Sequence, residues 1–335
     1  MIRYNRRMLS EFDLIKTYFM RTPPADARIG LGIGDDCALL APAPGTEMAV
    51  STDMLVEGRH FFAGADANSL GHKALAVNLS DLAAMGATPV AFTLALSLPA
   101  VDPAWLGAFS QGLLVLADLH HCALIGGDTT KGPLNICITV FGELPPRAAL
   151  RRDAAIAGDD LWVSGTLGDS RLALAVQRGE NGESAGLVLT DAQKGQAAQR
   201  LHRPTPRVAL GIALRGIAHA AIDISDGFSG DLGHILARSG CGASIDVDAL
   251  PAGPVLLEQT LDKRRAWTLA GGDDYELCFT APVSQRAAVI AAGITAKTPV
   301  TRVGSIDATA SMRLQDASGA LLPISPASFD HFRTT

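Results

Sequence analysis

Short apolar stretches alternate with longer amphipathic segments along most of the chain. Apolar residues recur at helical spacing over Leu70–Met85 and Trp105–Leu119, which predicts two helices in the first half. Asn68 and Ser69 are candidate N-cap residues of the first helix, and Gly86 is placed to end it. The same pattern predicts strands at Met48–Thr52, Ala91–Leu98, Leu134–Phe141, Leu161–Ser164 and Ile222–Ser225, and a further helix at Phe228–Arg238.

The alternation breaks once, near the middle of the chain. Pro145 and Pro146 are followed by the basic and polar stretch Arg147–Asp153, after which a new strand begins. We therefore predict two domains, residues 1–148 and 149–335, each built of helices and strands. The fold class that this organisation indicates is α+β, with two α/β-type domains.

Composition favours a globular protein with a large core. The 335 residues are 48% hydrophobic, which is enough to bury the interiors of two domains. The longest apolar runs, such as Leu113–Ala117, are too short to span a bilayer, and Met1–Phe19 lacks the uninterrupted apolar segment of a secretory signal. We expect no membrane partner and a cytoplasmic location.

Charge and cysteine usage exclude two further classes of protein. The 28 basic and 34 acidic residues give a net charge of −6, and no long basic run is present, so we expect no nucleic-acid partner. The five cysteines are scattered and form no Cys-x-x-Cys pair. This favours small buried side chains in a reducing compartment over a disulfide framework or a zinc site.

Aspartates beside glycines or hydroxyl residues recur at five places. Each of these segments follows a short apolar stretch, which predicts a strand that ends in a tight turn. Two bare carboxylates about 4 Å apart repel by about 4 kcal/mol at an effective dielectric constant of about 20, so converging turns would need cations between them. Mg²⁺ held by oxygen ligands and bridging phosphate groups is the leading interpretation. The five segments are Gly34–Asp36, Ser51–Asp53, Gly126–Thr130, Asp223–Gly227 and Gly271–Asp274.

Familiar nucleotide and hydrolase signatures are missing from the sequence. There is no Gly-x-x-x-x-Gly-Lys-Ser/Thr loop, no His-Glu-x-x-His and no Gly-x-Ser-x-Gly. Gly30–Gly34 alternates glycine with other residues, but an Asp pair stands where a dinucleotide fingerprint would begin its helix. A phosphate site would therefore have to be built from the aspartate segments.

Several polar residues have structural as well as functional interpretations. Asp81 and Asn78 share one face of a mostly apolar helix, which favours a site over a solvated stripe that would include Lys73. Arg152 could reach a phosphate group or could be an ordinary surface residue. Arg203 and Arg207, which flank prolines, could contact phosphate or could simply mark the ends of two helices.

Six motifs, taken in order, extend over nearly the whole chain. They are Gly-Ile-Gly-Asp-Asp-Cys-Ala (32–38), Ser-Thr-Asp-Met-Leu-Val-Glu-Gly-Arg-His-Phe (51–61), Lys-Ala-Leu-Ala-Val-Asn-Leu-Ser-Asp-Leu-Ala-Ala-Met-Gly-Ala (73–87), Gly-Gly-Asp-Thr-Thr (126–130), Asp-Ile-Ser-Asp-Gly (223–227) and Gly-Gly-Asp-Asp-Tyr-Glu-Leu (271–277). Together they resemble the bacterial thiamine-monophosphate kinase family. Asp273 stands where that family commonly has Glu.

The resemblance implies a fold and a set of site residues. The fold is the ATP-binding fold shared with aminoimidazole ribonucleotide synthetase, in which the N-terminal domains of two subunits pair into a barrel and ATP binds between the domains. By motif match, the implied Mg²⁺ ligands are Asp36, Ser51, Thr52, Asp53, Asp81, Asp128, Asp223 and Asp226, the implied ATP contacts are Gly127, Asp128, Arg152 and Ser225, and the implied acceptor contacts are His60, Asp273 and Phe329.

The activity that the resemblance implies is Mg²⁺-dependent transfer of a phosphoryl group from ATP to thiamine monophosphate, in the biosynthesis of thiamine diphosphate. The acceptor is a phosphate monoester with a second pKa of about 6, so it is largely a dianion at neutral pH and needs no general base. The implied partners are ATP, thiamine monophosphate and a second copy of the chain. Two alternatives stay open: another ATP-using enzyme of the same fold, and a non-catalytic sensor of metal or nucleotide.

Overall fold

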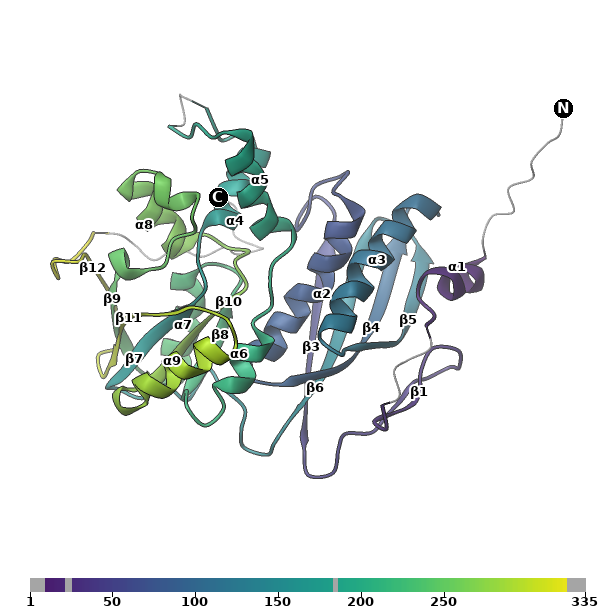
Figure 1. Ribbon diagram of the computed structural model, residues 1–335, viewed down its shortest axis with the longest axis horizontal. Helices are drawn as coiled ribbons and strands as arrows, with labels where there is room; N and C mark the ends of the chain where they lie inside the picture. The colour runs from purple at the N-terminus through teal and green to yellow at the C-terminus, as the bar shows by residue number, and fades with distance from the viewer. Residues whose placement is uncertain (1–9, 22–25, 183–185, 324–335) are drawn as a thin grey trace. The chain divides into compact units, whose positions relative to one another are not determined.

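A computed structural model gives the fold and describes residues 10–21, 26–182 and 186–323. The chain divides into two compact units, each with its own sheet and helices (Figure 1). The N-terminal unit comprises Met1–Leu79 and Pro89–Glu143, and the C-terminal unit comprises Ser80–Thr88 and Leu144–Thr335. The mixture of helices and strands confirms the predicted α+β class.

The N-terminal unit contains a four-stranded sheet in the order β3–β6–β4–β5. Strands β4 and β5 are parallel, and β1 and β2 form a separate antiparallel pair. Helices α2 and α3 lie side by side over the sheet (Figure 1). The elements are α1 (Glu11–Tyr18), β1 (Ile29–Leu31), β2 (Leu39–Leu40), β3 (Glu47–Val56), α2 (Ala67–Ala84), β4 (Thr88–Leu98), α3 (Pro103–Leu119), β5 (Ala123–Lys131) and β6 (Asn135–Leu144).

Helix α2 begins earlier than the sequence pattern predicts. The carboxylate of Asp66 accepts a hydrogen bond from the amide of Ser69 at 2.8 Å, as an N-cap residue does. The prediction of Asn68 or Ser69 as the N-cap is therefore wrong, because both lie inside the helix. The predicted end is confirmed, since Gly86 adopts a left-handed conformation with φ of 69° directly after the helix.

The C-terminal unit contains a six-stranded sheet in the order β12–β9–β11–β7–β10–β8. Neighbouring strands are antiparallel, except that β12 and β9 are parallel. The elements are β7 (Asp159–Ser164), α4 (Asp169–Gln177), α5 (Asp191–His202), α6 (Val208–Ala213), β8 (Ala220–Ile224), α7 (Phe228–Ser239), β9 (Gly242–Asp246), α8 (Leu261–Ala270), β10 (Glu276–Pro282), α9 (Arg286–Thr295), β11 (Val300–Asp307) and β12 (Met312–Gln315), with short 3₁₀ turns at Val247–Ala249, Leu256–Glu258 and Val283–Gln285.

The packing of helix α7 determines which way Asp223 points. Phe228 and Leu232 of α7 are fully buried in one core with Ile222 and Ile224 of β8. Successive side chains of a strand point to opposite faces of the sheet. Asp223, which lies between the two isoleucines, therefore projects from the other face of β8.

The end of helix α2 belongs to the C-terminal unit. Arg215 donates through Nε to the carbonyl oxygen of Gly86 and through Nη2 to the hydroxyl of Thr88 at 2.9 Å. The amide of Leu150 also donates to the carbonyl oxygen of Met85 at 3.1 Å. These contacts fix the segment Ser80–Thr88, and with it Asp81, within the C-terminal unit.

Three of the five aspartate segments do not form the strand exits that the sequence predicts. Ser51–Asp53 and Gly126–Thr130 lie inside β3 and β5, because β-branched and hydroxyl residues continue a strand well. Gly271–Asp274 follows helix α8 and leads into β10. The prediction is confirmed for Gly34–Asp36, which follows β1, and for Asp223–Gly227, where β8 ends.

Two predictions from composition can also be compared with the fold. Of the helices in the described ranges, none has both the length and the apolar character needed to cross a membrane. The five cysteines are all free thiols, and Cys122, Cys241 and Cys278 are buried as expected. Cys37 is exposed and Cys137 is only half-buried, so the expectation that the cysteines are buried is wrong at these two positions.

Candidate functional site

Strand β3 carries the first group of predicted metal ligands. The amide of Asp53 donates to Oδ1 of Asn78 at 3.1 Å, and Nδ2 of Asn78 donates to the carbonyl oxygen of Ala74 at 2.9 Å, so this buried asparagine links α2 to β3. Strand alternation puts Ser51 and Asp53 on one face and Thr52 on the other. There the Thr52 hydroxyl lies 2.8 Å from the Thr139 hydroxyl. Thr52 could therefore join Ser51 and Asp53 around one ion only through its backbone carbonyl.

Strand β5 carries Gly127 and Asp128 at the opposite edge of the same sheet. Gly127 has φ of 143°, and a Cβ atom on it would overlap the carbonyl oxygen of Leu94 on β4, so only glycine fits. Asp128 is exposed. Strands β3 and β5 are three inter-strand spacings apart, about 14 Å along the sheet, so the two groups of ligands would need more than one ion.

Asp36 and His60 lie in loops of the N-terminal unit. Asp36 is exposed, and its amide donates to Oδ1 of Asp35 at 2.8 Å. Nδ1 of His60 accepts a hydrogen bond from the amide of Val56 at 3.0 Å. A neutral imidazole that accepts at Nδ1 carries its proton on Nε2, so His60 would present a donor at its outer nitrogen.

Asp223 is the centre of an acidic cluster in the C-terminal unit. Its side chain is buried and accepts a hydrogen bond from the Ser80 hydroxyl at 2.8 Å. The pKa of Asp223 is raised to about 8. Burial is the larger cause, and the nearby carboxylate of Asp81 is the second. Asp81, near the end of α2, therefore lies close to Asp223 at the end of β8.

Asp231, in the first turn of α7, holds the segment that follows β8. Its Oδ2 accepts hydrogen bonds from the amides of Ser225 at 3.0 Å and Asp226 at 3.1 Å. Burial raises the pKa of Asp231 to about 7, and the charge of Asp226 acts in the same direction. Asp231 thus fixes the backbone of two predicted site residues from a buried position.

Arg152 and Asp273 complete this cluster. The guanidinium of Arg152 is exposed, and its charge lowers the pKa values of both Asp223 and Asp231, which places it near the acids. The amide of Asp273 donates to the carbonyl oxygen of Ser225 at 2.8 Å. The predicted acceptor residue Asp273 is therefore attached directly to the predicted ATP contact.

The donor chemistry of this cluster suits a hard divalent cation. Asp81 and Asp223 repel each other, and burial opposes the charge of Asp223. A cation between them would relieve both costs, and carboxylate oxygens are the ligands that Mg²⁺ prefers. Within the described ranges, however, no three His, Cys, Asp or Glu side chains lie close enough together to hold a metal ion. The Mg²⁺ ligand set stays a prediction.

The structure thus groups some of the predicted residues and separates others. Asp81, Asp223, Ser225, Asp226, Arg152 and Asp273 come together in the C-terminal unit, and the remaining described residues lie in the N-terminal unit. Phe329 lies outside the described residues.

Sequence reasoning missed two residues of this cluster. The missed residues are Ser80, which directly precedes Asp81, and Asp231, the acid in the first turn of α7. An acid in a first helical turn is usually explained by the helix dipole, so no separate signal marks Asp231 in the sequence.

The sequence matches two domain families in tandem. Residues 34–144 match the AIR synthase related protein, N-terminal domain, and residues 157–316 match the AIR synthase related protein, C-terminal domain. The thiamine-monophosphate kinase of Salmonella typhimurium is 46% identical over 325 residues, which is 97% of this chain and 98% of that protein. The chain belongs to the thiamine-monophosphate kinase family. This confirms the resemblance found in the six motifs.

Solved structures of the thiamine-monophosphate kinase family have the same fold. The crystal structure of thiamine-monophosphate kinase from Stenotrophomonas maltophilia K279a is 48% identical, with a TM-score of 0.80, over 87% of this chain and 92% of that chain. A structure of AaThiL complexed with AMPPCP and TMP is 27% identical, with a TM-score of 0.74, over 87% of this chain and 89% of that chain.

Proposed function

We propose that this chain transfers the γ-phosphoryl group of ATP to thiamine monophosphate, which gives ADP and thiamine diphosphate. The observation that carries the proposal is the complex of the related AaThiL with AMPPCP and TMP, a protein that shares the fold along most of both chains. The 46% identity to the Salmonella typhimurium kinase supports the same activity. The reaction would serve thiamine diphosphate biosynthesis in the cytoplasm, where the free thiols would stay reduced.

The residues of the C-terminal cluster fit this reaction by binding and orienting. Arg152 would contact an ATP phosphate, and the backbone of Ser225, fixed by Asp231, would lie beside it. Asp273 would face the positively charged ring of the acceptor, because a carboxylate stabilises a nearby cation. No side chain has to remove a proton, since the attacking phosphate is already largely ionised at neutral pH.

The proposed Mg²⁺ ions would be held by residues of both units. In the N-terminal unit these residues lie on β3, on β5 and, for Asp36, in the loop between β1 and β2, and in the C-terminal unit they are the three acids at the ends of α2 and β8. Bound Mg²⁺ would neutralise the charge of the two phosphate substrates and allow direct in-line transfer. The proposed ligands are Asp36, Ser51, Thr52, Asp53, Asp81, Asp128, Asp223 and Asp226, and the further proposed substrate contacts are Gly127 and Asp128 for ATP and His60 and Phe329 for the acceptor.

An assay of ADP release with thiamine monophosphate tests the proposed activity. We expect ADP and thiamine diphosphate to form in equal amounts, and only when Mg²⁺ is added. Aminoimidazole precursors and selenide should give no ADP release. Nucleotide binding without turnover would instead indicate a sensor. With ATP made chiral at the γ-phosphorus, direct transfer predicts inversion, whereas retention would indicate a phosphorylated enzyme intermediate.

We also propose that a second copy of the chain covers the four-stranded sheet to complete a barrel. Val50 and Met54 of β3 are 57% and 52% exposed, and Leu55 beside them is buried, as alternation requires. An open sheet face with exposed apolar residues favours a partner surface. Sedimentation should give twice the chain mass, and Val50→Lys with Met54→Lys should give a monomer. A wild-type monomer at micromolar concentration would contradict the proposed dimer.

A further inference from the structure

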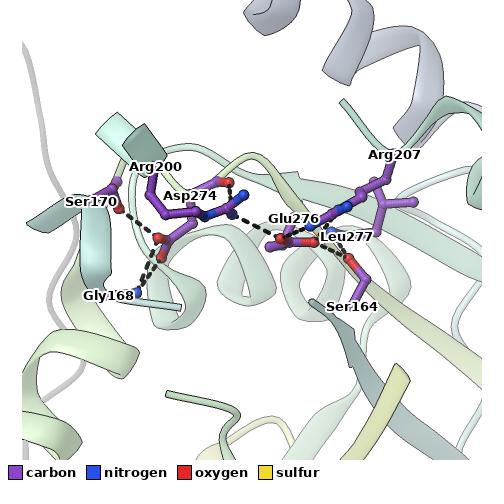
Figure 2. A network of polar contacts seen from close by, with 9 residues as sticks. Ser164, Gly168, Ser170, Arg200, Arg207, Asp274, Glu276 and Leu277 are labelled. Carbon is purple, nitrogen blue, oxygen red and sulfur yellow. Dashed lines mark hydrogen bonds and ion pairs between the residues drawn. The ribbon is translucent and has the colours of Figure 1, made fainter. Parts of the chain in front are cut away.

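Glu276 is a fully buried carboxylate at the start of β10, and four donors converge on it (Figure 2). Nη2 of Arg200 donates to Oε1 at 2.8 Å, and Nη2 of Arg207 donates to the same oxygen. Nε of Arg207 and the hydroxyl of Ser164 each donate to Oε2 at 2.6 Å. Gly165 makes room for this carboxylate, because a Cβ atom at residue 165 would overlap it. Arg207 is thus committed to an internal ion pair, and its interpretation as a phosphate contact is not supported.

Arg200 connects this ion cluster to the backbone of the Gly271–Asp274 segment. The same Nη2 that donates to Glu276 also donates to the carbonyl oxygen of Asp274 at 2.9 Å. Arg200 comes from helix α5, so a side chain from a separate helix holds this segment. The guanidinium of Arg200 therefore bridges the buried carboxylate of Glu276 and the backbone carbonyl of Asp274.

The side chain of Asp274 provides a second attachment for the segment. Its two carboxyl oxygens each lie 3.0 Å from the amide of Gly168, which donates to them. The Ser170 hydroxyl lies 2.5 Å from Oδ1 of Asp274 and 2.8 Å from the carbonyl oxygen of Gly272. The residues on both sides of Asp273 are thereby held from the N-terminal end of α4 and from α5.

Asp273 itself has a left-handed backbone conformation, which Asp adopts less readily than Gly but more readily than most other residues. Its φ is 64°, and that of Tyr275 is 52°, both in the left-handed region that favours glycine. The amides of Asp273 and Tyr275 donate to the carbonyl oxygens of Ser225 and Ile224, each at 2.8 Å. Such a conformation persists where surrounding contacts hold it, and it is concentrated at functional sites.

The cluster is better explained by positioning than by stability. A buried ion cluster contributes little more to stability than apolar packing of the same volume, because the charges lose their hydration. Here the cluster adjoins a strained turn whose central residue, Asp273, is the proposed acceptor contact. We propose that Arg200 and Glu276 are positioning residues that hold Asp273 in its left-handed conformation, and so set the affinity for the phosphate acceptor. This inference rests on the proposed function.

The test compares the kinetic constants of Arg200 variants for the two substrates. Arg200→Met keeps an unbranched apolar stem and leaves Glu276 paired with Arg207 and Ser164, but it removes the guanidinium that bridges to the Asp274 carbonyl. We expect the KM for thiamine monophosphate to rise at least tenfold, while the KM for ATP changes less than twofold. Arg200→Lys, which can make one of the two contacts, should give an intermediate KM. Should Arg200→Met fail to fold, Arg200→Lys carries the test alone.

A matched control separates positioning from general loss of stability. Asp160 is another buried carboxylate paired with two arginines, Arg286 and Arg302, at the other end of β7. Arg286→Met removes one of the two arginines from Asp160. It should leave the KM values for ATP and thiamine monophosphate within twofold of the wild type. The melting temperatures of all variants are measured alongside.

A double-mutant cycle identifies the residue through which Arg200 acts. Asp273→Asn should raise the KM for thiamine monophosphate about as much as Arg200→Met does, and the double variant should show little further increase. Three results would overturn the positioning role and leave the proposed function standing. They are a double variant whose KM rises by the product of the two single effects, equal changes in the KM values for ATP and thiamine monophosphate, and unchanged KM values in an active enzyme. A wild-type chain without ADP release on thiamine monophosphate would instead overturn the proposed function, and this inference with it.

Discussion

The acids of the two units lie in different surroundings. In the N-terminal unit, Asp36 and Asp128 are exposed, on a loop and on an edge strand. In the C-terminal unit, Asp223, Asp231 and Asp274 are buried, and burial raises their pKa values to about 8, 7 and 8. The first group is exposed to water, whereas the second is buried and held by hydrogen bonds within the unit.

This difference in burial predicts that the acids of the two units affect stability differently. A buried carboxylate that is not fully compensated costs folding free energy, and such costs are concentrated at functional sites. The C-terminal unit therefore pre-organises its part of the site at the expense of stability. The exposed acids of the N-terminal unit carry no such cost, so their removal should affect activity alone.

The largest expected effect is that of Asp81→Asn. Loss of a proposed Mg²⁺ ligand should lower kcat at least about 10³-fold, since charge stabilisation provides most of the rate in phosphoryl transfer. In metal-free protein the same change removes repulsion on Asp223, so the free energy of unfolding should rise by about 1 kcal/mol. Stopped assays and urea denaturation measure the two quantities. Asp191→Asn, at a nearly fully exposed acid, is the control and should change neither.

Asp128→Asn should abolish turnover without the gain in stability. Because Asp128 is exposed, the free energy of unfolding should stay within about 0.5 kcal/mol of the wild type. Near-normal kcat at ordinary Mg²⁺ concentration would refute the metal assignment of this residue. A stability gain equal to that of Asp81→Asn would remove the contrast between the two units.

Gly127→Ala should destabilise the N-terminal unit by about 3 kcal/mol. The reason is that residue 127 has a φ of 143° and that the added Cβ atom would overlap the Leu94 carbonyl oxygen. Gly126→Ala is the matched control, because its Cβ would meet nothing closer than 3.9 Å, at Thr93. Calorimetric unfolding distinguishes the two variants. Equal melting temperatures would show that β5 can move away from β4 at no cost.

The last expected effect is a change in the pH dependence of stability in Asp274→Asn. The pKa of Asp274 is raised from 3.8 to about 8 in the folded chain, so the folded state keeps a proton that the unfolded state releases. The free energy of unfolding should therefore fall as pH rises through this window, by up to about 1.4 kcal/mol per pH unit for this group. The asparagine variant should show a flatter slope between about pH 5 and 7. Identical slopes would show that Asp274 is ionised in the folded protein.

Several helices could be predicted from the sequence, but whether an aspartate segment lies in a turn or inside a strand was predicted less well. The helices at 70–85, 105–119 and 228–238 were found because their apolar spacing is long and regular. The prediction of turns at Ser51–Asp53 and Gly126–Thr130 was wrong, because both segments lie inside strands. Aspartate and glycine indicate a turn only where the strand does not continue past them.

The support of the site could not be predicted, because it depends on contacts distant in sequence. Arg200 reaches Asp274 across 74 positions, and Arg207 reaches Glu276 across 69. No periodicity or short motif links such pairs. The approach of Asp81 to Asp223 was predicted only through the family resemblance, since these residues are also far apart along the chain.

The overlap that a Cβ atom at residue 165 would make with the Glu276 carboxylate has a consequence for the history of the family. A side chain at residue 165 would displace the Glu276 carboxylate from its arginine partners, and the left-handed φ of 54° also disfavours a residue other than glycine there. A lineage that gains a side chain at 165 should therefore also have changed Glu276, whereas a lineage that loses Glu276 can keep the glycine.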